Sequence, residues 1–425
     1  MKKKKAPLVR RMKEFVKTSV VWGPLDHNLF FTIIFLNVYG IIMVYSASYN
    51  NSITKNYSYF MNNQLKNVIF GFVIMIVASY VNYHRIVRFG WGWFWLLAAV
   101  AIIAALKTPL AHSELGATRW IKLGPVSFQA AEPIKAAIII FFAYYVSYWG
   151  LNRWYNQLLA CLLAIALLGF LFFFSNNLST VIVLFCICAV IILSSVKKPD
   201  LYWYFLLGLA LIIIAAIFVT VYLWMHQGAE NFRFVRIRAW LHPEEYAADE
   251  GLQAMQARYA IGAGGFWGKG LGQSLIKFKL SYSYNDFILA IICEELGVFG
   301  VIVMMTLFGY LLYRIYKIAQ NAWDIEGKVL AIGVFTQIAL QLLINVMVVT
   351  SVIPTTGVTL PFFSAGGTSV VFLLAELGMV LNVDKYAKER RFFEEAERHV
   401  AQMEQRGGIG AAGWRRRLDS ARTRR

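Results

Sequence analysis

The stretch DHNLFFTIIFLNVYGIIMVYSAS, residues 26–48, decides the fold class, because it runs from Leu29 to Ser48 without a charged side chain. An α-helix needs about 20 apolar residues to cross the hydrocarbon layer of a bilayer, which is about 30 Å thick. Further candidate spans begin near Val68, Trp91, Ile134, Gln157, Leu178, Leu201, Asp286, Val329 and Thr368. We therefore predict an all-α polytopic membrane protein with about ten transmembrane helices.

Composition supports a membrane environment. Of the 425 residues, 59% are hydrophobic and 15% are charged, whereas a soluble globular chain is about 45–50% apolar. The formal net charge is +18, which on a soluble protein would suggest nucleic acid as a partner. Here the Lys and Arg residues flank apolar spans, where anionic lipid headgroups attract them. We expect no nucleic-acid partner.

The distribution of Lys and Arg predicts that both termini lie in the cytoplasm, because cytoplasmic loops carry an excess of these residues. This orientation places basic loops inside, at 83–89, 151–155, 195–200 and 313–328. It places 50–63, 175–177 and 351–367, which carry few or no basic residues, outside. We predict a basic cytoplasmic segment over 1–25, a membrane domain over 26–383, and a basic tail over 384–425. A large extracytoplasmic loop, 227–285, would join spans 7 and 8.

Three outside segments are rich in Gly, Pro and polar residues, namely 116–135, 226–286 and 352–369. Irregular backbone at membrane depth is tolerated only where it is buried in protein or lines a cavity. We therefore expect these segments to meet around a polar cavity on the outer face.

The first segment ends in Glu132, Pro133 and Lys135. Proline suits the first position of a helix, and Glu132 and Lys135, three residues apart, would share one helix face. One interpretation is an interfacial ion pair, or a lysine that reaches the headgroups. The other is a pair that lines the cavity together with Arg119, which is itself an alternative headgroup anchor.

The second segment carries Arg233, Arg236 and Arg238, followed by IGAGGFWGKGLG at 261–272. This is not a phosphate-binding P-loop, because that motif would need Gly in place of Ala263 and Ser or Thr in place of Gly270. The glycines still allow backbone amides and Lys269 to approach an anionic group closely.

Asp286 begins the eighth predicted span, where it is either a helix N-cap or a general base at the membrane surface. Glu294 and Glu295 lie about two turns deeper, and carboxylates inside a membrane are costly and usually functional. At about 100° per residue, Glu294 lies nearer the face of Asp286 than Glu295 does.

Taken together, these residues resemble the SEDS family (shape, elongation, division and sporulation), which includes FtsW, RodA and SpoVE. The similarity covers about residues 25 to 383 in five ordered blocks, at 26–48, 116–135, 251–274, 285–297 and 355–369. The block VTLPFFSAGG and the basic ends look more like FtsW or SpoVE than RodA.

The resemblance implies a peptidoglycan glycosyltransferase in the bacterial cytoplasmic membrane, with an extracytoplasmic active site and lipid II as substrate. Asp286 matches the family's catalytic aspartate. Arg119, Glu132 and Lys135 match positions of its first outer motif, and Lys269 with 262–272 matches its glycine-rich motif. The resemblance also implies a class B penicillin-binding protein as partner, with other divisome or elongasome membrane proteins.

Some positions depart from the family pattern. Tyr284 and Asn285 replace a His and a Thr or Ser before the aspartate, and Asn177 stands where some members have an acid. AAEP, at 130–133, replaces a common Pro-Ser-Glu-Leu, and Ala365 replaces a Tyr. These departures leave the aspartate in place, but the role of the missing acid cannot be transferred.

The expected chemistry is sugar transfer from a pyrophosphate leaving group, with Asp286 taking the proton from the acceptor hydroxyl. The residues predicted to bind substrate and pyrophosphate are Arg119, Glu132, Lys135, Arg236, Arg238, Lys269 and Glu294. A divalent metal, Mg²⁺ or Mn²⁺, would sit near Asp286 or Glu132 and be held partly by substrate phosphates, since no dedicated cage is visible. The alternatives are a lipid II flippase and a non-catalytic division scaffold.

Overall fold

The computed structural model describes residues 21, 24–48, 59–109, 111–114, 117–123, 126–175, 177–196, 232–245, 251–278, 280 and 284–405. The side chains of 91, 112–119, 123–127 and 232–234 are outside this description. The predicted span that begins near Leu201 lies outside the described residues, as do most of the predicted N-terminal segment and the end of the tail.

Within the described residues, long helices occupy the positions of the nine other predicted spans. They are α2 (His27–Ser48), α3 (Tyr59–Tyr80), α5 (Trp93–Ala105), α6 (Ala131–Trp149), α7 (Trp154–Ser175), α8 (Leu178–Ser195), α12 (Ile288–Gln320), α13 (Ile325–Val349) and α14 (Thr368–Gln405). Six of them, α2, α3, α7, α8, α12 and α13, are long and apolar enough to cross a membrane. The chain is thus a mainly helical polytopic membrane protein, while the total of ten spans and their orientation stay predictions.

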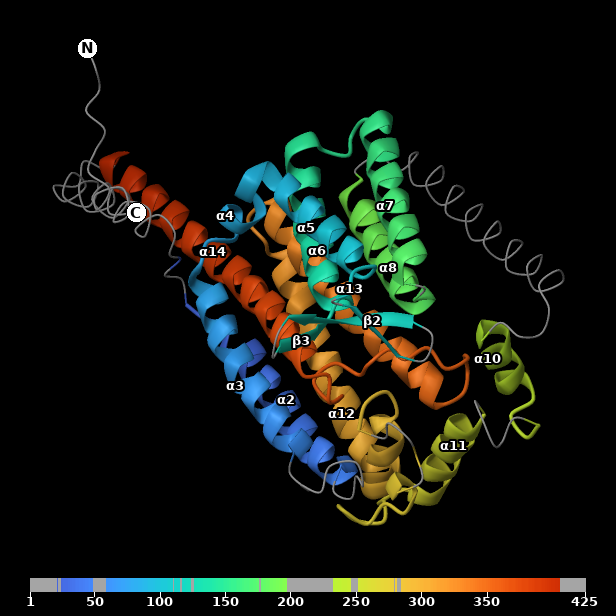
Figure 1. The fold of residues 1–425 in the computed structure, drawn as a ribbon. Helices are drawn as coiled ribbons and strands as arrows, with labels where there is room; N and C mark the ends of the chain where they lie inside the picture. The colour runs from blue at the N-terminus through green and yellow to red at the C-terminus, as the bar shows by residue number, and fades with distance from the viewer. Residues whose placement is uncertain are drawn as a thin grey trace.

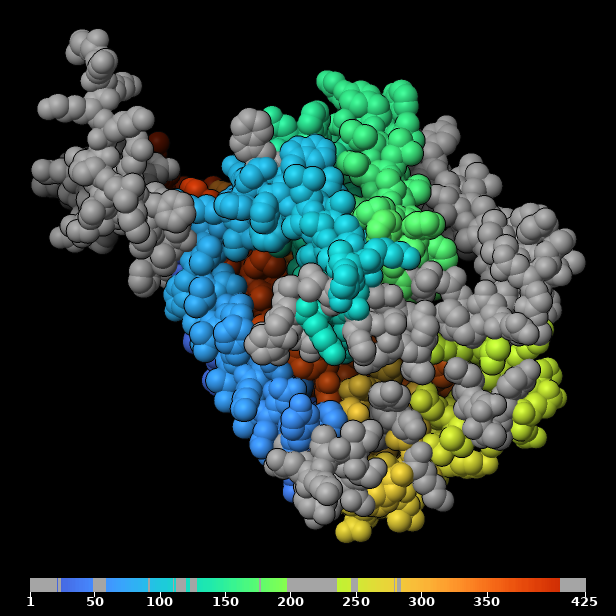
Figure 2. Space-filling view, in the orientation of Figure 1, coloured from blue at the N-terminus to red at the C-terminus, as the bar shows by residue number. Residues whose placement is uncertain are grey.

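Four long helices, α5, α8, α13 and α14, pack against α6, whose side chains from Ala137 to Val146 are all buried. α13 packs against α6, α8 and α12, and α14 packs along α3 (Figure 1). Figure 2 shows α14, in dark red, at the bottom of a recess beside α3. A helix that is apolar on all faces belongs in the interior, which explains the central place of α6.

Shorter elements connect the long helices. They are α4 (Tyr83–Val87), η1 (Phe89–Gly92), α10 (Phe232–Leu241), α11 (Leu252–Gly264), η2 (Ile276–Phe278) and the strands β1 (Ala111–Glu114), β2 (Ala117–Leu123) and β3 (Val126–Gln129). The strands form an antiparallel sheet in the order β1-β2-β3, in which Trp120 pairs with Gln129. An all-α prediction misses this sheet, although Thr, Trp, Ile, Val and Phe around a Gly-Pro pair favour a hairpin.

α12 is broken at Gly297, which has φ 65° and ψ −164°. The loop that follows α11 supplies the missing backbone partners. The Lys269 and Gly270 N–H groups donate to the carbonyls of Glu294 and Glu295, each at 2.9 Å. The Val298 and Phe299 N–H groups donate to the carbonyls of Gly265 and Phe266, each at 3.1 Å. The break therefore leaves these polar groups paired, as a low-dielectric environment requires.

This close contact depends on glycine. A Cβ atom on Gly264 would stand 1.9 Å from the carbonyl oxygen of Cys293, whereas one on Gly262, in the same helix, would meet nothing within 4 Å. We predict that Gly264→Ala lowers the free energy of unfolding by about 1–3 kcal/mol. Gly262→Ala, the matched control, should be neutral or stabilising by up to about 1 kcal/mol. Thermal unfolding in detergent measures both, and equal melting temperatures would contradict the packing described.

At the other end of the bundle, three residues from two elements, α4 and α13, contact the Asp324 carboxylate. Its Oδ2 accepts the Tyr83 hydroxyl at 2.7 Å and lies 2.7 Å from His84 Nε2, and its Oδ1 accepts the Gly327 N–H at 2.8 Å. Burial raises the pKa of Asp324, but the hydrogen bonds from His84, Gly327 and Tyr83 outweigh it and hold that pKa below its ordinary value. The ionised carboxylate thus ties α4 to the start of α13.

We predict that Asp324→Asn, which keeps a helix cap, costs about 2 kcal/mol of stability at neutral pH. The folded-state pKa of Asp324 is depressed, so its contribution is present above the unfolded value of about 4 and is lost as pH falls through the folded value. The difference in melting temperature between wild type and variant should therefore shrink below about pH 4. A difference that stays constant down to pH 2 would refute this assignment.

Candidate active site

A cavity lies where α12 begins, at the end of the bundle opposite Asp324. It contains about 880 Å³ of space, including the part open to solvent. Trp120 and Gln129 come from the sheet, Arg236 from α10, Gln253 from α11, Asp286 from the turn before α12, and Thr359 from the loop before α14. All three segments rich in Gly, Pro and polar residues therefore meet around one cavity, as expected.

Asp286 belongs to the turn 284–287 and lines the cavity. α12 begins at Ile288, and its N-cap is Phe287, which makes no side-chain capping bond. The N-cap interpretation of Asp286 is therefore wrong. The side chain is half-buried at the cavity wall, where a carboxylate can meet a bound molecule.

Three successive carbonyl groups hold the turn in place. The carbonyl of Tyr284 accepts the Ala365 N–H at 2.9 Å, and that of Asn285 accepts the Ser364 hydroxyl at 2.8 Å. The carbonyl of Asp286 accepts Asn345 Nδ2 at 2.9 Å, and the same amide also donates to the carbonyl of Val358 at 2.9 Å. Asp286 is thus fixed to α13 and to the loop before α14, which favours a preorganised site.

Sequence reasoning did not identify Asn345 or Ser364. A signal for Asn345 was present, because Gln337, Gln341 and Asn345 follow one another at intervals of four residues within an apolar span. Such spacing places them on one helix face, and polar residues inside a membrane usually face the interior. All three are buried in the structure.

The predicted arginines occupy different places. Arg236 lines the cavity, and α10 is anchored nearby by Trp240 Nε1, which donates to the carbonyl of Ser351 at 2.9 Å. Arg238 is half-buried on the same helix but is not among the residues that line the cavity. Arg119 belongs to β2 next to Trp120, and its side chain is outside the described part of the chain.

Glu132 and Lys135 form a buried ion pair, with 2.8 Å between Oε2 and Nζ and only 4% and 3% of the residues exposed. This excludes the interpretation as an interfacial pair. Glu132 lines a smaller cavity of about 270 Å³, which shares Thr359 with the cavity of Asp286. The pair therefore adjoins the larger cavity through Thr359, but neither residue is among those that line it.

The prediction that Lys269 and Glu294 bind substrate needs a correction. In the structure the two residues pair with each other, with 2.7 Å between Lys269 Nζ and Glu294 Oε1. Glu294 also accepts the N–H groups of Leu275 and Ile276, at 3.1 and 3.3 Å. Neither residue is among those that line the cavity of Asp286. The physical reason is the break in α12, which buries Glu294 against the loop after α11 and requires donors there. The anionic group that Lys269 approaches is this carboxylate.

Glu295 is likewise engaged by the loop. Its Oε1 lies 3.3 Å from Lys277 Nζ, and its Oε2 accepts the Ser46 hydroxyl at 2.5 Å. Neither of the two glutamates is among the residues that line the cavity of Asp286, although the sequence favoured Glu294.

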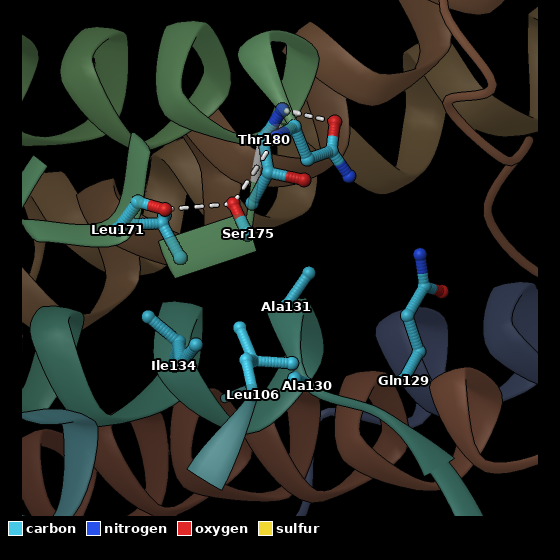
Figure 3. A pocket seen from close by; sticks show the side chains of 9 residues that line it. Leu106, Gln129, Ala130, Ala131, Ile134, Leu171, Ser175 and Thr180 are labelled. Carbon is cyan, nitrogen blue, oxygen red and sulfur yellow. Dashed lines mark hydrogen bonds between the residues drawn. The ribbon is translucent and has the colours of Figure 1, made fainter. Parts of the chain in front are cut away.

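A third cavity, of about 250 Å³, adjoins the first and shares Gln129 with it. Figure 3 shows Gln129 on one side of it and Ser175 and Thr180 on the other. Asn177 caps α8, since its Oδ1 accepts the Thr180 N–H at 3.4 Å. Asn177, which stands where some members of the resembled family have an acid, thus has a structural role here.

No three His, Cys, Asp or Glu side chains of the described residues are placed to hold a metal ion together. Glu132 is engaged by Lys135, and Asp286 is the carboxylate among the residues lining the larger cavity. Magnesium is usually bound by one or two carboxylates plus substrate phosphates. Asp286 alone fits that pattern, with the remaining ligands supplied by a bound molecule.

We predict that Asn345→Leu destabilises the protein, because two buried carbonyl groups lose their donor at about 1–3 kcal/mol each. Leu343→Ala is the control, since Leu343 lies on the same helix and is 54% exposed. Melting temperatures of the two variants in detergent test this, and an unchanged Asn345→Leu protein would show that the turn before α12 is held by other means.

Comparison with known proteins agrees with this arrangement. Residues 26–389 match the family model for FtsW, RodA and SpoVE, described as cell cycle protein. The chain is 32% identical over 382 residues to the probable peptidoglycan glycosyltransferase FtsW of Trichlorobacter lovleyi, covering 88% of this chain and 96% of that one. It is 33% identical over 373 residues to the stage V sporulation protein E of Bacillus subtilis, covering 84% and 96%.

Solved structures share the fold. One, from a study of how a peptidoglycan synthase complex coordinates polymerization and crosslinking, superposes with a TM-score of 0.71 over 86% of this chain and 99% of that one, at 22% identity. The rod shape determining protein RodA of Thermus thermophilus gives a TM-score of 0.61 over 85% and 97%, also at 22% identity. The matches in sequence and in fold together show that this chain belongs to the FtsW/RodA/SpoVE family.

Proposed function

We propose that this protein is a peptidoglycan glycosyltransferase that polymerises lipid II on the outer face of the bacterial cytoplasmic membrane, with Asp286 as general base. The observation that supports this most is the position of Asp286 on the wall of a large cavity that also contains Arg236. Relatives at 31–33% identity over most of the chain include proteins named probable peptidoglycan glycosyltransferase.

In the proposed reaction, the carboxylate of Asp286 takes the proton from the 4-hydroxyl of the acceptor sugar. The freed oxygen attacks the anomeric carbon of the donor, and the bond from that carbon to the pyrophosphate oxygen breaks. A positioned base contributes about 10²–10⁴-fold to such a step. The hydrogen bond from Asn345 to the carbonyl of Asp286 orients the turn before the substrate arrives.

Negative charge grows on the pyrophosphate as it leaves, and a cation in the cavity stabilises it. Among the described residues, Arg236 is the cation on the cavity wall. Two further arginines belong to elements that line the cavity, namely Arg119 in β2 and Arg238 in α10. Lys269 is committed to Glu294, so we assign it to the loop rather than to the leaving group. A divalent metal, Mg²⁺ or Mn²⁺, bound by Asp286 and substrate phosphates, would supply further positive charge.

The proposed partner is a single-pass class B penicillin-binding protein, which would crosslink the new strands. The solved complex with a similar fold is described as coordinating polymerization and crosslinking, which supports a partner of this kind. A role in division or sporulation agrees with the FtsW and SpoVE relatives.

We predict that Asp286→Asn reduces polymerisation of labelled lipid II by the purified protein by at least about 10²-fold, because the amide cannot accept the proton. The assay is run with and without a co-expressed class B penicillin-binding protein, and with Mg²⁺ or Mn²⁺. An Asp286→Asn melting temperature equal to that of wild type shows that the loss is chemical.

Two outcomes would contradict the proposal. A polymerisation rate of Asp286→Asn equal to that of the wild type would show that Asp286 is not the general base. Failure of the wild type to make strands under every condition, with lipid II still crossing the bilayer of liposomes, would favour a flippase. Truncation of 1–20 and 390–425 tests the scaffold alternative, since a scaffold loses function there rather than at Asp286.

A further inference from the structure

Glu376 of α14 is a second buried carboxyl group beside the pair of Glu132 and Lys135. Only 1% of Glu376 is exposed. α14 packs against α6, and Leu373, one turn before Glu376, lines the smaller cavity together with Glu132. Its Oε2 accepts Gln337 Nε2, from α13, at 2.8 Å. The three titratable side chains thus form one cluster, contributed by α6 and α14 and bordered by α13.

The charges of this cluster do not balance if both carboxyl groups are ionised. Lys135 brings one positive charge and contacts Glu132 at 2.8 Å. The donor to Glu376 is a neutral amide, and Glu376 Oε1 has no hydrogen-bond partner among the described residues. An uncompensated charge inside a protein costs several kcal/mol, and such groups usually become neutral instead.

We propose that Glu376 holds a proton at neutral pH and acts as a positioning residue for the pair of Glu132 and Lys135. As a neutral acid, Glu376 still accepts the hydrogen bond from Gln337. It does not compete with Glu132 for the single ammonium group, so Lys135 remains on Glu132. Glu376 is therefore an uncharged acid, and the charges of Glu132 and Lys135 cancel, so that the cluster of the three residues is electrically neutral.

The cluster is connected to the candidate active site. Glu132 lines the smaller cavity together with Gln341 and Thr359, and Thr359 also lines the cavity of Asp286. One face of α13 runs from Gln337 at Glu376, through Gln341, to Asn345 at the Asp286 turn, in steps of about 6 Å. A displaced Lys135 would therefore disturb Glu132 and, through Thr359, the wall that the two cavities share.

The charged groups that act on Glu376 are few. Lys135 and Glu132 come from α6, while α13 presents the neutral Gln337. α3, which packs along α14, has one charged residue, Lys66, and that residue is exposed. Protonation of Glu376 is thus decided by this cluster rather than by remote charges.

Infrared difference spectroscopy of the full-length protein, in a detergent without ester groups, tests the proposal directly. A protonated carboxylic acid has a C=O stretching band that moves to lower frequency in D₂O. Wild type at pH 7 should show this band, Glu376→Gln should lack one such band, and Glu376→Asp should keep it at a shifted frequency. Glu295→Gln is the control, since Glu295 is paired with Lys277 and should contribute no such band.

Identical protonated-acid bands in wild type and Glu376→Gln would overturn the proposal, because Glu376 would then be ionised. If Glu376→Gln does not fold, the wild type is compared with Glu376→Asp instead. A protonated-acid band at the same frequency in these two proteins would equally overturn the proposal. These measurements need no turnover, so they stand or fall independently of the proposed function.

The consequence for activity rests on the proposed function. Gln is the neutral isostere of the protonated acid, so Glu376→Gln should retain more lipid II polymerisation at neutral pH than Glu376→Ala. The alkaline limb of the wild-type pH profile should move upward in Glu376→Gln, because that variant has no proton to lose at this position. A profile with the same alkaline limb in both proteins would contradict the positioning role.

If the wild type makes no glycan strands but still shows the infrared band of a protonated acid, the result counts against the proposed glycosyltransferase activity and leaves the protonation of Glu376 standing.

Discussion

Backbone polar groups that this chain brings to membrane depth must find partners within the chain, because lipid offers none. The break in α12 is the place where this constraint is most demanding. The helix loses its regular hydrogen bonds around Gly297, and the loop after α11 replaces them with bonds to Glu294, Glu295, Val298 and Phe299. That loop fits only because Gly264 and Gly268 bring backbone against backbone. The position of the candidate active site, just before α12, depends on this contact.

The need for partners within the chain also determines how the buried charged residues pair. Glu294 and Glu295 are paired with Lys269 and Lys277, so the loop contributes its lysines to holding α12 rather than to binding a substrate. A carboxylate inside the bundle is stabilised only by donors and cations that reach it. Residues that look available in the sequence are therefore often already engaged in the structure. Asp286 lies on the wall of the larger cavity.

Much of the fold was predictable from the sequence, because long apolar runs identify membrane helices directly. α3 begins at Tyr59 rather than near Val68, since its first turns are polar and the hydropathy pattern does not reveal them. The meeting of three distant Gly- and Pro-rich segments also followed from the sequence. The sequence did not show which side chains face the cavity, because the break at Gly297 and the strand pairing of Trp120 with Gln129 arise from tertiary contacts.

The break at Gly297 also gives α12 two arms that one loop holds together. One arm begins at Ile288, shortly after Asp286, and the other continues to Gln320. The loop after α11 bonds the first arm at Glu294 and Glu295 and the second arm at Val298 and Phe299. Trp267 and Phe266 at the tip of that loop are 73% and 55% exposed. The loop therefore splints α12 on both sides of Gly297. The bend keeps its angle without regular hydrogen bonds across it, so the turn that carries Asp286 holds a fixed direction relative to the rest of the bundle.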